Sequence, residues 1–405
     1  HRWGTFPSFS AGWRVSEEKF MKKYEWIDNL KVRSSWGKLG NHRTTDYQYI
    51  ATIGLGQNYP FNNAISDGAA QTTANNENIT WETTTEFNLG IDFSMKKGLF
   101  NMSVDYYNRY TDDILTTVPV TYLYGLTAPV SNAGAMRNKG IEVSLGHANK
   151  IGDFAYDLSG YIAYNKNKVE KYPNPSKGDY IQMEGVAWNS FYGYECIGKF
   201  QSNEEVANSA VQSSLVKAGD LKFKDQNGDG KIDADDRVVL GNTIPEITYG
   251  FNLGANYKNF DFSASFQGAA KVYRTFDRET MWGFIDGANA SKRHLNRTIV
   301  ENGVVVKEGK YPRTLINQAQ NRVMSSFLVL NASYLRLKNL QIGYNIPQSF
   351  LQKINISRAR IYVSGENLLT LTSFPKDVDP EVSNGYAGYS YPQVAIYTFG
   401  LDITF

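Results

Sequence analysis

The sequence predicts an all-β protein, an antiparallel transmembrane β-barrel, from three observations. Apolar and polar residues alternate along long segments, the apolar sets of these segments carry no charge, and short connections alternate with long ones. Alternation with a period of two is the pattern of a strand with two different faces. The composition agrees, because 27 Tyr, 22 Phe and 35 Gly favour strands and tight turns over helices.

The clearest alternating segment runs from Trp81 to Phe93. Its odd positions are Trp, Thr, Thr, Phe, Leu, Ile and Phe, and its even positions include Glu82, Glu86 and Asp92. A charge facing lipid near the middle of a bilayer costs about 2–4 kcal/mol. Charge-free sets in a chain that is 20% charged therefore favour lipid contact. Segments of this length exceed the ~5–6 residues usual in soluble sheets and match the ~9–11 that cross a bilayer at a tilt.

The same alternation locates the strands. We expect a β-bulge near Asn339, where the apolar positions of one segment change phase. The expected strands are 8–15, 30–38, 81–95, 100–110, 134–147, 153–166, 188–200, 236–241, 246–257, 260–271, 333–346, 358–367 and 394–405.

We expect residues 1–405 to form a single domain, the C-terminal part of an outer-membrane barrel. Short turns and long loops alternate in such barrels, the long loops lying outside the cell. The expected extracellular loops are 41–79, 110–132, 168–187, 272–332 and 367–392.

Bulk properties exclude several other classes. The net charge is +2, from 42 basic and 40 acidic residues interspersed along the chain, so we expect no nucleic-acid partner. The single Cys196 excludes an intrachain disulfide. The start of the chain lacks the features of a signal peptide, and we expect a fragment or cleavage product.

Several motifs, in order along almost the whole chain, resemble the C-terminal barrel half of SusC/RagA-type TonB-dependent transporters. They are Phe6–Arg14, Leu30–Asn41, Thr80–Glu82, Asn132–Gly134, Asn138–Glu142, Gly219–Leu221, Asp225–Gly230, Ser333–Leu340, Gly365–Leu368, Asp379–Glu381 and Tyr397–Leu401.

This resemblance implies a 22-stranded barrel of which the chain is about half. It also implies an outer-membrane location in a Gram-negative, Bacteroidota-like cell, in contact with outer-membrane lipid. The implied partners are a SusD-like surface lipoprotein, the remaining N-terminal barrel and plug segment, and TonB, which acts through that N-terminal part. The function expected from it is TonB-dependent import of oligosaccharides or peptides.

One local motif points to a bound cation. Asp225, Asn227, Asp229, Lys231, Asp233 and Asp236 follow the spacing of an EF-hand loop, in which Lys231 supplies a backbone carbonyl and Asp236 replaces the usual Glu. We expect calcium at this loop. The alternative is a solvated turn rich in Asx residues that holds no ion.

Other candidate sites are weaker. The four His residues are scattered, and no nucleophile elbow, phosphate loop or catalytic triad is present, so we expect no enzyme. Loop aromatics such as Trp282, Tyr122, Tyr386 and Tyr389 could stack on sugars or serve as packing. Charges on the polar phase of the strands indicate a hydrated, mixed-charge barrel interior: Arg33, Glu82, Glu86, Asp92, Asp105, Arg109, Glu142, Asp157, Arg336, Lys338 and Arg360. The residues that bind substrate cannot be identified from these patterns.

Two other functions remain open. One is a surface scaffold or adhesin that uses a barrel without active transport. The other is a soluble, calcium-stabilised β-protein that binds glycans. The presence of a plug with a TonB box separates the transporter from the scaffold, and a requirement for detergent separates both from the soluble protein.

Overall fold

The computed structural model describes residues 3–42, 47–275, 281–285, 287, 289–316, 319–352, 356–376, 378–381, 391 and 393–405. These fall into two compact units. The first comprises His1–His147, Ala163–Ser176 and Gln182–Trp188, and the second comprises Ala148–Ile162, Lys177–Ile181 and Asn189–Phe405. Strand β10 (Phe154–Lys171) has residues in both, and so does the end of β9 (Val130–Ile151). The single barrel domain expected from the sequence stays a prediction.

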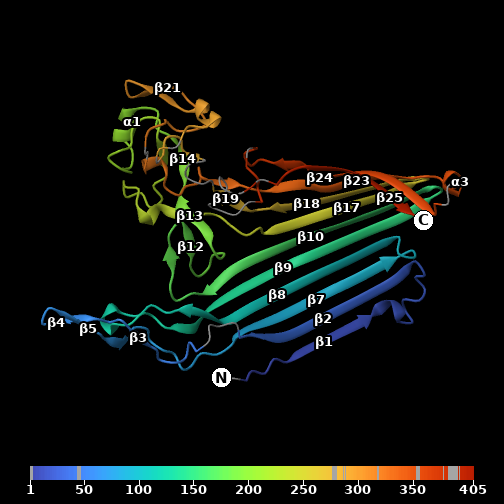
Figure 1. Cartoon of the computed structure of the whole chain (residues 1–405), viewed down its shortest axis with the longest axis horizontal. Helices are drawn as coiled ribbons and strands as arrows, with labels where there is room; N and C mark the ends of the chain where they lie inside the picture. Colours follow the sequence, from blue (N-terminus) through green and yellow to red (C-terminus); the bar gives the residue numbers. More distant parts are fainter. Residues whose placement is uncertain are drawn as a thin grey trace. The chain divides into compact units, whose positions relative to one another are not determined.

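The first unit is built on an antiparallel sheet of long strands. In sheet order these are β1 (Ser8–Arg14), β2 (Ile27–Asn41), β7 (Glu82–Met95), β8 (Phe100–Thr117) and β9 (Val130–Ile151), which lie side by side in Figure 1. The longest, β8 and β9, have 18 and 22 residues, so they exceed the ~9–11 residues needed to cross a bilayer.

The register of this sheet places apolar side chains in some rows across the strands and polar side chains in the rows between them. Val32 pairs with Ile91, Ile91 with Val104, and Val104 with Val143. The adjacent row is polar: Arg33 pairs with Gly90, Gly90 with Asp105, and Asp105 with Glu142. Because successive residues of a strand point to opposite faces, the sheet has one apolar face and one polar face.

The second unit contains a similar antiparallel sheet. In order its strands are β17 (Ile247–Tyr257), β18 (Phe260–Ala270), β23 (Tyr334–Asn345), β24 (Arg358–Thr372) and β25 (Ile396–Thr404). An apolar row runs through Phe262, Ile342, Val363 and Phe399. The register shifts between Leu337 and Asn339, which confirms the predicted bulge.

The apolar faces are exposed along their length. Leu89, Ile342 and Phe399 are 43%, 44% and 72% exposed. A soluble sheet would bury such a face in a core. Among the described residues, no helix has the length and apolar content to cross a membrane.

Short elements fill the long connections. In the first unit they are η1 (Val15–Glu17), β3 (Ile53–Leu55), β4 (Tyr59–Phe61), β5 (Ala64–Ser66), β6 (Ala69–Gln71) and η2 (Tyr122–Tyr124). From residue 176 onward they are β11 (Ser176–Lys177), β12 (Tyr180–Gln182), β13 (Ser190–Tyr194), β14 (Cys196–Lys199), α1 (Asn203–Ala207), β15 (Leu221–Phe223), η3 (Ala234–Asp236), β16 (Arg237–Gly241), β19 (Tyr273–Thr275), η4 (Lys292–Asn296), β20 (Ile299–Glu301), β21 (Val304–Lys307), η5 (Ala319–Asn321), β22 (Val329–Asn331) and α3 (Gln348–Leu351).

Three long connections of the second unit share one hydrophobic core. It brings together side chains from 189–246, 271–333 and 373–395, among them Leu221, Trp282 and Phe374, all at most 4% exposed. These connections therefore form a packed module, which Figure 1 draws beyond one end of β17 and β18.

A buried carboxylate ties two of these connections together. Asp220 is fully buried and accepts two hydrogen bonds from the guanidinium of Arg313, both 2.8 Å, and a third from the Asn321 amide, also 2.8 Å. The preceding Gly219 has φ +82°, and a side chain there would meet Val300. This position therefore requires glycine.

The expected 188–200 strand is wrong as a member of the large sheet. The segment splits into β13, which pairs with β12 and β16, and β14, which pairs with β15. Phe191 is fully buried and Gly193 packs against the backbone of Met324, so β13 is covered by the module. The expected 236–241 strand is present as β16, also in this smaller sheet.

Connection lengths also differ in part from expectation. β8 continues to Thr117 and β9 begins at Val130, so the 110–132 loop is reduced to 118–129. The 168–187 loop begins after Lys171 and its excursion continues to residue 246. Residues 43–46 of the first expected loop, 276–280, 286, 288, 317 and 318 of the fourth, and 377, 382–390 and 392 of the last lie outside the described residues.

A glycine in the middle of a polar row allows an ion pair to cross a strand. Arg33 on β2 reaches Asp105 on β8, with Nη1 2.6 Å from Oδ1, by passing over Gly90 on β7. A Cβ atom at Gly90 would lie 2.6 Å from both the Arg33 Cζ and the Asp105 Oδ1. In the second unit, a Cβ at Gly343 on β23 would likewise overlap the ion pair between Arg360 on β24 and Asp261 on β18.

We expect Gly90→Ala to displace Arg33 from Asp105 and to lower the free energy of unfolding by about 1–2 kcal/mol. The measurement is denaturant unfolding of the folded protein in detergent. Gly146→Ala is the matched control, because the nearest atom to a Cβ there is 3.8 Å away. In an Arg33→Ala background the cost of Gly90→Ala should fall by more than half. An unchanged cost would show that the ion pair is not what the glycine protects.

Candidate functional site

The polar face of the first unit forms a charged surface around a pocket of about 540 Å³. Arg33 Nε lies 2.9 Å from Asp92 Oδ2, so this cation also neutralises a second carboxylate besides Asp105. Arg109 Nε lies 2.7 Å from Glu86 Oε2. The structure thus brings these predicted polar-phase charges together as ion pairs.

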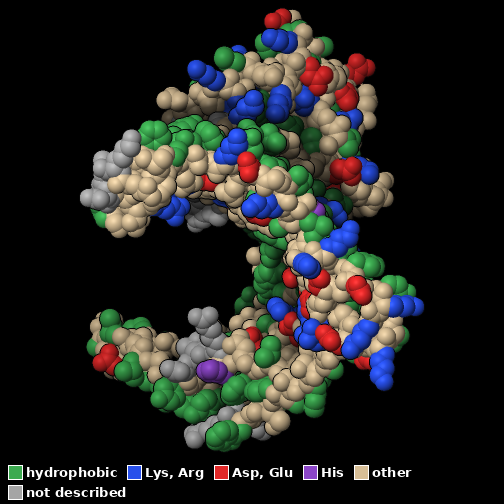
Figure 2. All heavy atoms as spheres, turned by 90° about the vertical axis from the view of Figure 1, so that its right-hand side faces the viewer, with side chains coloured by type: hydrophobic (Ala, Val, Ile, Leu, Met, Phe, Trp, Pro, Cys, Tyr) green, Lys and Arg blue, Asp and Glu red, His purple; other side chains and the backbone are tan. Residues whose placement is uncertain are grey.

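Uncharged polar groups complete this pocket. Tyr107 Oη donates to Asn165 Oδ1 at 3.0 Å, and Asn88 donates to Glu86 Oε1 at 3.0 Å. Glu142 adds a further, exposed carboxylate to the lining. Such a wall of amide, hydroxyl and charged groups offers donors and acceptors to hydrated, polar solutes. Figure 2 shows another view of the surface, in which basic and acidic side chains are also interspersed.

A second polar site surrounds Arg336 on β23, which is 3% exposed. Its Nε donates to Thr370 Oγ1 at 2.9 Å, its Nη2 lies 2.8 Å from Asp379 Oδ1, and its Nη1 contacts Glu381 and the amide oxygen of Gln393. Each nitrogen of the guanidinium therefore has an acceptor. We call this group of five residues the Arg336 clasp.

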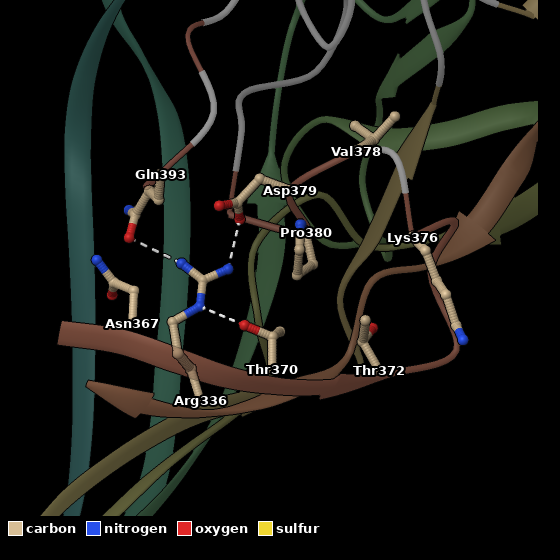
Figure 3. Close-up of a pocket in the computed structure, with 9 residues that line it drawn as sticks. All are labelled: Arg336, Asn367, Thr370, Thr372, Lys376, Val378, Asp379, Pro380 and Gln393. Carbon is tan, nitrogen blue, oxygen red and sulfur yellow. Dashed lines mark hydrogen bonds and ion pairs between the residues drawn. The ribbon is translucent and has the colours of Figure 1, made fainter. Parts of the chain in front are cut away.

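Four of the five clasp residues, all except Glu381, line a pocket of about 340 Å³ that Figure 3 shows. Asn367 reaches it from a bulge in β24, where its φ is +53°, and Lys376 points away from the guanidinium. Three motifs of the sequence, Ser333–Leu340, Gly365–Leu368 and Asp379–Glu381, thus meet at one place. The clasp fastens the connection after β24 to the polar face of β23.

Glu381 is the most heavily bonded carboxylate of the clasp. Tyr334 Oη donates to its Oε1 at 2.6 Å, and Lys338 Nζ lies 2.9 Å from its Oε2. Burial works against the charged form, but the Tyr334 hydrogen bond and the cations Lys338 and Arg336 outweigh it, so the pKa of Glu381 lies below its ordinary value. The clasp therefore favours the charged form of Glu381.

The predicted cation-binding residues lie in one loop between β15 and β16. Asp225 accepts from the N–H groups of Gly228 (2.6 Å) and Gly230 (2.9 Å), and Asp236, which is fully buried, accepts from Gln226 and Asp233. Asn227, Asp229 and Asp233 each accept from the N–H two residues onward, and Lys231 is the residue that donates to Asp229. No group of three or more His, Cys, Asp or Glu residues in the described segments is arranged to hold a metal.

The remaining candidate residues from the sequence lie in different environments in the structure. Trp282 belongs to the hydrophobic core of the module, so it is packing, whereas Tyr122 is fully exposed. Tyr386 and Tyr389 lie outside the described residues. His1 lies outside them as well. Among the others, His294 is buried and hydrogen-bonded inside the module.

Sequence reasoning identified Arg336, Lys338 and Arg360 but missed their acceptors. Asp261 is the partner of Arg360, and Asp379 and Glu381 are the partners of Arg336. The signal available for the second pair was the Asp379–Glu381 motif beside a charge-rich strand. The alternation of apolar and polar residues locates strands, but it does not show which strand a loop about 40 residues later will contact. The contacts of the clasp could therefore not be predicted from it.

Comparison with known proteins identifies a family and several relatives that match this chain. The family model described as TonB dependent receptor-like, beta-barrel, matches residues 1–368. TonB-dependent receptor P3 of Formosa agariphila is 32% identical, in an alignment covering 100% of this chain and 42% of that protein. TonB-dependent receptor SusC of Bacteroides thetaiotaomicron is 30% identical, covering 100% and 40%.

Among solved structures, the RagAB peptide transporter is similar over 100% of this chain and 44% of its own, with a TM-score of 0.79 and 27% identity. The RagAB peptide importer in its open-open state gives a TM-score of 0.80 and 26% identity over 99% and 42%. The chain spans about two fifths of the length of these relatives.

We expect Arg336→Ala to leave Asp379 and Glu381 as poorly compensated buried carboxylates, which costs about 3–5 kcal/mol when one partner of a buried pair is removed. The connection of residues 373–395 should then detach from β23 and be cut faster by protease, while the strands stay intact. The control is Arg358→Ala, which removes an exposed arginine from the neighbouring strand. Equal cleavage of the two variants would refute the fastening role.

Proposed function

The chain belongs to the TonB-dependent receptor β-barrel family and is of the SusC/RagA type, an outer-membrane protein group of Bacteroidota, and from this premise we propose that it forms part of an importer of oligosaccharides or peptides. The family is one of transporters and receptors. The observation that carries the proposal is the two-faced sheet, with exposed apolar rows on one side and paired charges on the other.

The two faces support transport through complementary roles. An exposed apolar face suits the hydrocarbon of a bilayer, where each backbone group must be paired within the sheet. A face of paired charges and amides suits a hydrated interior, because its groups bind polar solutes without presenting a field of one sign. The paired charges also leave few unpaired charges to trap a passing ligand.

We further propose that TonB acts through a segment outside these 405 residues and that a SusD-like surface lipoprotein covers the long connections. What supports the second partner is the packed module, whose core draws on residues 189–246 and 271–333. A connection with a core of its own is more than a link between strands. The largest expected loop, 272–332, is the main candidate surface for this partner.

A strain lacking the whole gene should lose energy-dependent uptake of a labelled oligosaccharide or peptide that the wild-type strain accumulates. Collapse of the proton-motive force by a protonophore should abolish uptake in the wild type but leave surface binding. A scaffold or adhesin predicts the reverse pattern, in which deletion reduces surface binding and leaves accumulation unchanged. That outcome would replace the transporter proposal.

Gentle purification from native membranes should recover a surface lipoprotein in stoichiometric amount with the barrel. Replacing residues 299–307, the β20–β21 hairpin, by a short Gly-Ser turn should reduce recovery of the lipoprotein if the module carries the interface. The matched control is a similar replacement of the hairpin 59–66 in the first unit. Recovery of the barrel alone from cells that express the lipoprotein would contradict the proposal that a lipoprotein covers the long connections.

We also propose that loop 225–236 binds a divalent cation, with Asp225, Asn227, Asp229, Asp233 and Asp236 as side-chain ligands and the Lys231 carbonyl. The support is the spacing together with Asp225, whose oxygens gather two N–H groups of the loop. Calcium should slow proteolysis of this loop relative to EDTA, and Asp225→Ala with Asp229→Ala should abolish the difference. Equal cleavage of the unmodified protein in calcium and in EDTA would show a turn stabilised only by its own hydrogen bonds.

A further inference from the structure

A cavity of about 540 Å³ lies in the packed module, and its lining residues are not shared with the two polar sites above. Two segments line most of it, one around Phe284 and the other spanning Ala290 to Arg297, with Thr314 completing the wall. Both segments belong to the second unit.

His294 holds these two segments together. Its side chain is 6% exposed, and its Nε2 lies 2.9 Å from the Met281 carbonyl, while the Ser291 N–H lies 3.0 Å from its Nδ1. The two ring nitrogens of His294 therefore contact one segment each. Gly283 allows the close approach, because a Cβ there would lie 3.2 Å from that of Ala290.

The cavity presents apolar side chains that are not used in a core. Phe284 is 45% exposed and Leu295 is 77% exposed. Phe284 also has a φ of +61°, a conformation that is an outlier for a bulky residue. Such strain costs on the order of 1–3 kcal/mol, persists only where the surroundings hold it, and concentrates at ligand sites.

Among the described residues, the charged side chains that line the cavity are of one sign. Lys292 and Arg297 line it, none of the described lining residues is acidic, and neither cation makes an ion pair within the described segments. This contrasts with Arg33, Arg313 and Arg336, which are each paired with carboxylates. The described part of the lining therefore offers cations and hydroxyl groups without a counter-charge.

We propose that this cavity binds the terminal carboxylate of a peptide between Lys292 and Arg297, with the adjoining apolar side chain against Phe284 and Leu295. The inference rests on the proposed import function, whose substrate it narrows to peptides. A neutral oligosaccharide fits less well, because its hydroxyl groups seek carboxylate and amide acceptors, and the described lining residues include neither. A terminal carboxylate instead takes up the donors that are present.

The test is direct binding to the intact receptor purified in detergent. Fluorescence anisotropy is measured with a fluorescein-labelled peptide that ends in leucine, once with a free carboxylate and once as the C-terminal amide. The free acid should bind at least tenfold more tightly than the amide. Lys292→Gln with Arg297→Gln should remove this preference, whereas Leu295→Ser should weaken both peptides and leave the ratio unchanged.

Lys307→Gln with Lys310→Gln is the matched control, because it removes two exposed cations of the same module that do not line the cavity. An equal loss of preference in the control would overturn the proposal, as would equal affinity of acid and amide for the unmodified receptor. Displacement of the labelled peptide by an oligogalacturonate as readily as by the unlabelled free acid would also overturn it.

Binding and uptake fail separately in this design. Binding needs neither TonB nor an energised membrane, so a carboxylate preference without accumulation in cells would contradict the import function and leave the cavity assignment standing. Accumulation of peptide by cells that carry the Lys292→Gln, Arg297→Gln receptor at the wild-type rate and affinity would sink the cavity assignment alone.

Discussion

The structure depends on the pairing of opposite charges on the polar face of two-faced strands. Arg33 neutralises Asp92 and Asp105, Arg360 neutralises Asp261, and Arg336 neutralises Asp379 and Glu381. Removing one partner of such a pair would leave the other charge poorly compensated, which is most costly where the pair is buried, as at Arg336. The charges of the polar rows thus have partners within reach on the face opposite the apolar rows.

The long connections of the second unit follow a different rule. They do not extend the two-faced sheet but enclose a hydrophobic core of their own, and Asp220 joins them through Arg313 and Asn321. Their backbone polar groups would otherwise rely on solvent. A connection that is packed in this way can present a surface of fixed shape, which a partner or ligand can recognise without first ordering it.

The long strands could be predicted from sequence because their alternation is a local signal, and the bulge near Asn339 was visible as a change of phase. The segment 188–200 was predicted wrongly, because β13 within it is buried or half-buried on both faces while its residues are still spaced as in a strand of the large sheet. The clasp escaped it for another reason: Arg336 and Glu381 meet only through the fold of a loop. The family resemblance carried what periodicity could not, namely which protein class these strands belong to.

The ion pair of Arg33 over Gly90 also fixes the register of β2, which the alternation of apolar and polar residues alone does not. A strand that slips by two residues keeps its apolar side chains on the apolar face, so the pattern alone tolerates errors of even length. A slip of β2 by two residues would carry Arg33 away from Gly90 and out of reach of Asp105. The ion pair over Gly90 therefore forms in only one register, whether a strand is shifted by an odd or an even number of residues. A misaligned sheet would carry unneutralised charges, which favour its rearrangement during folding.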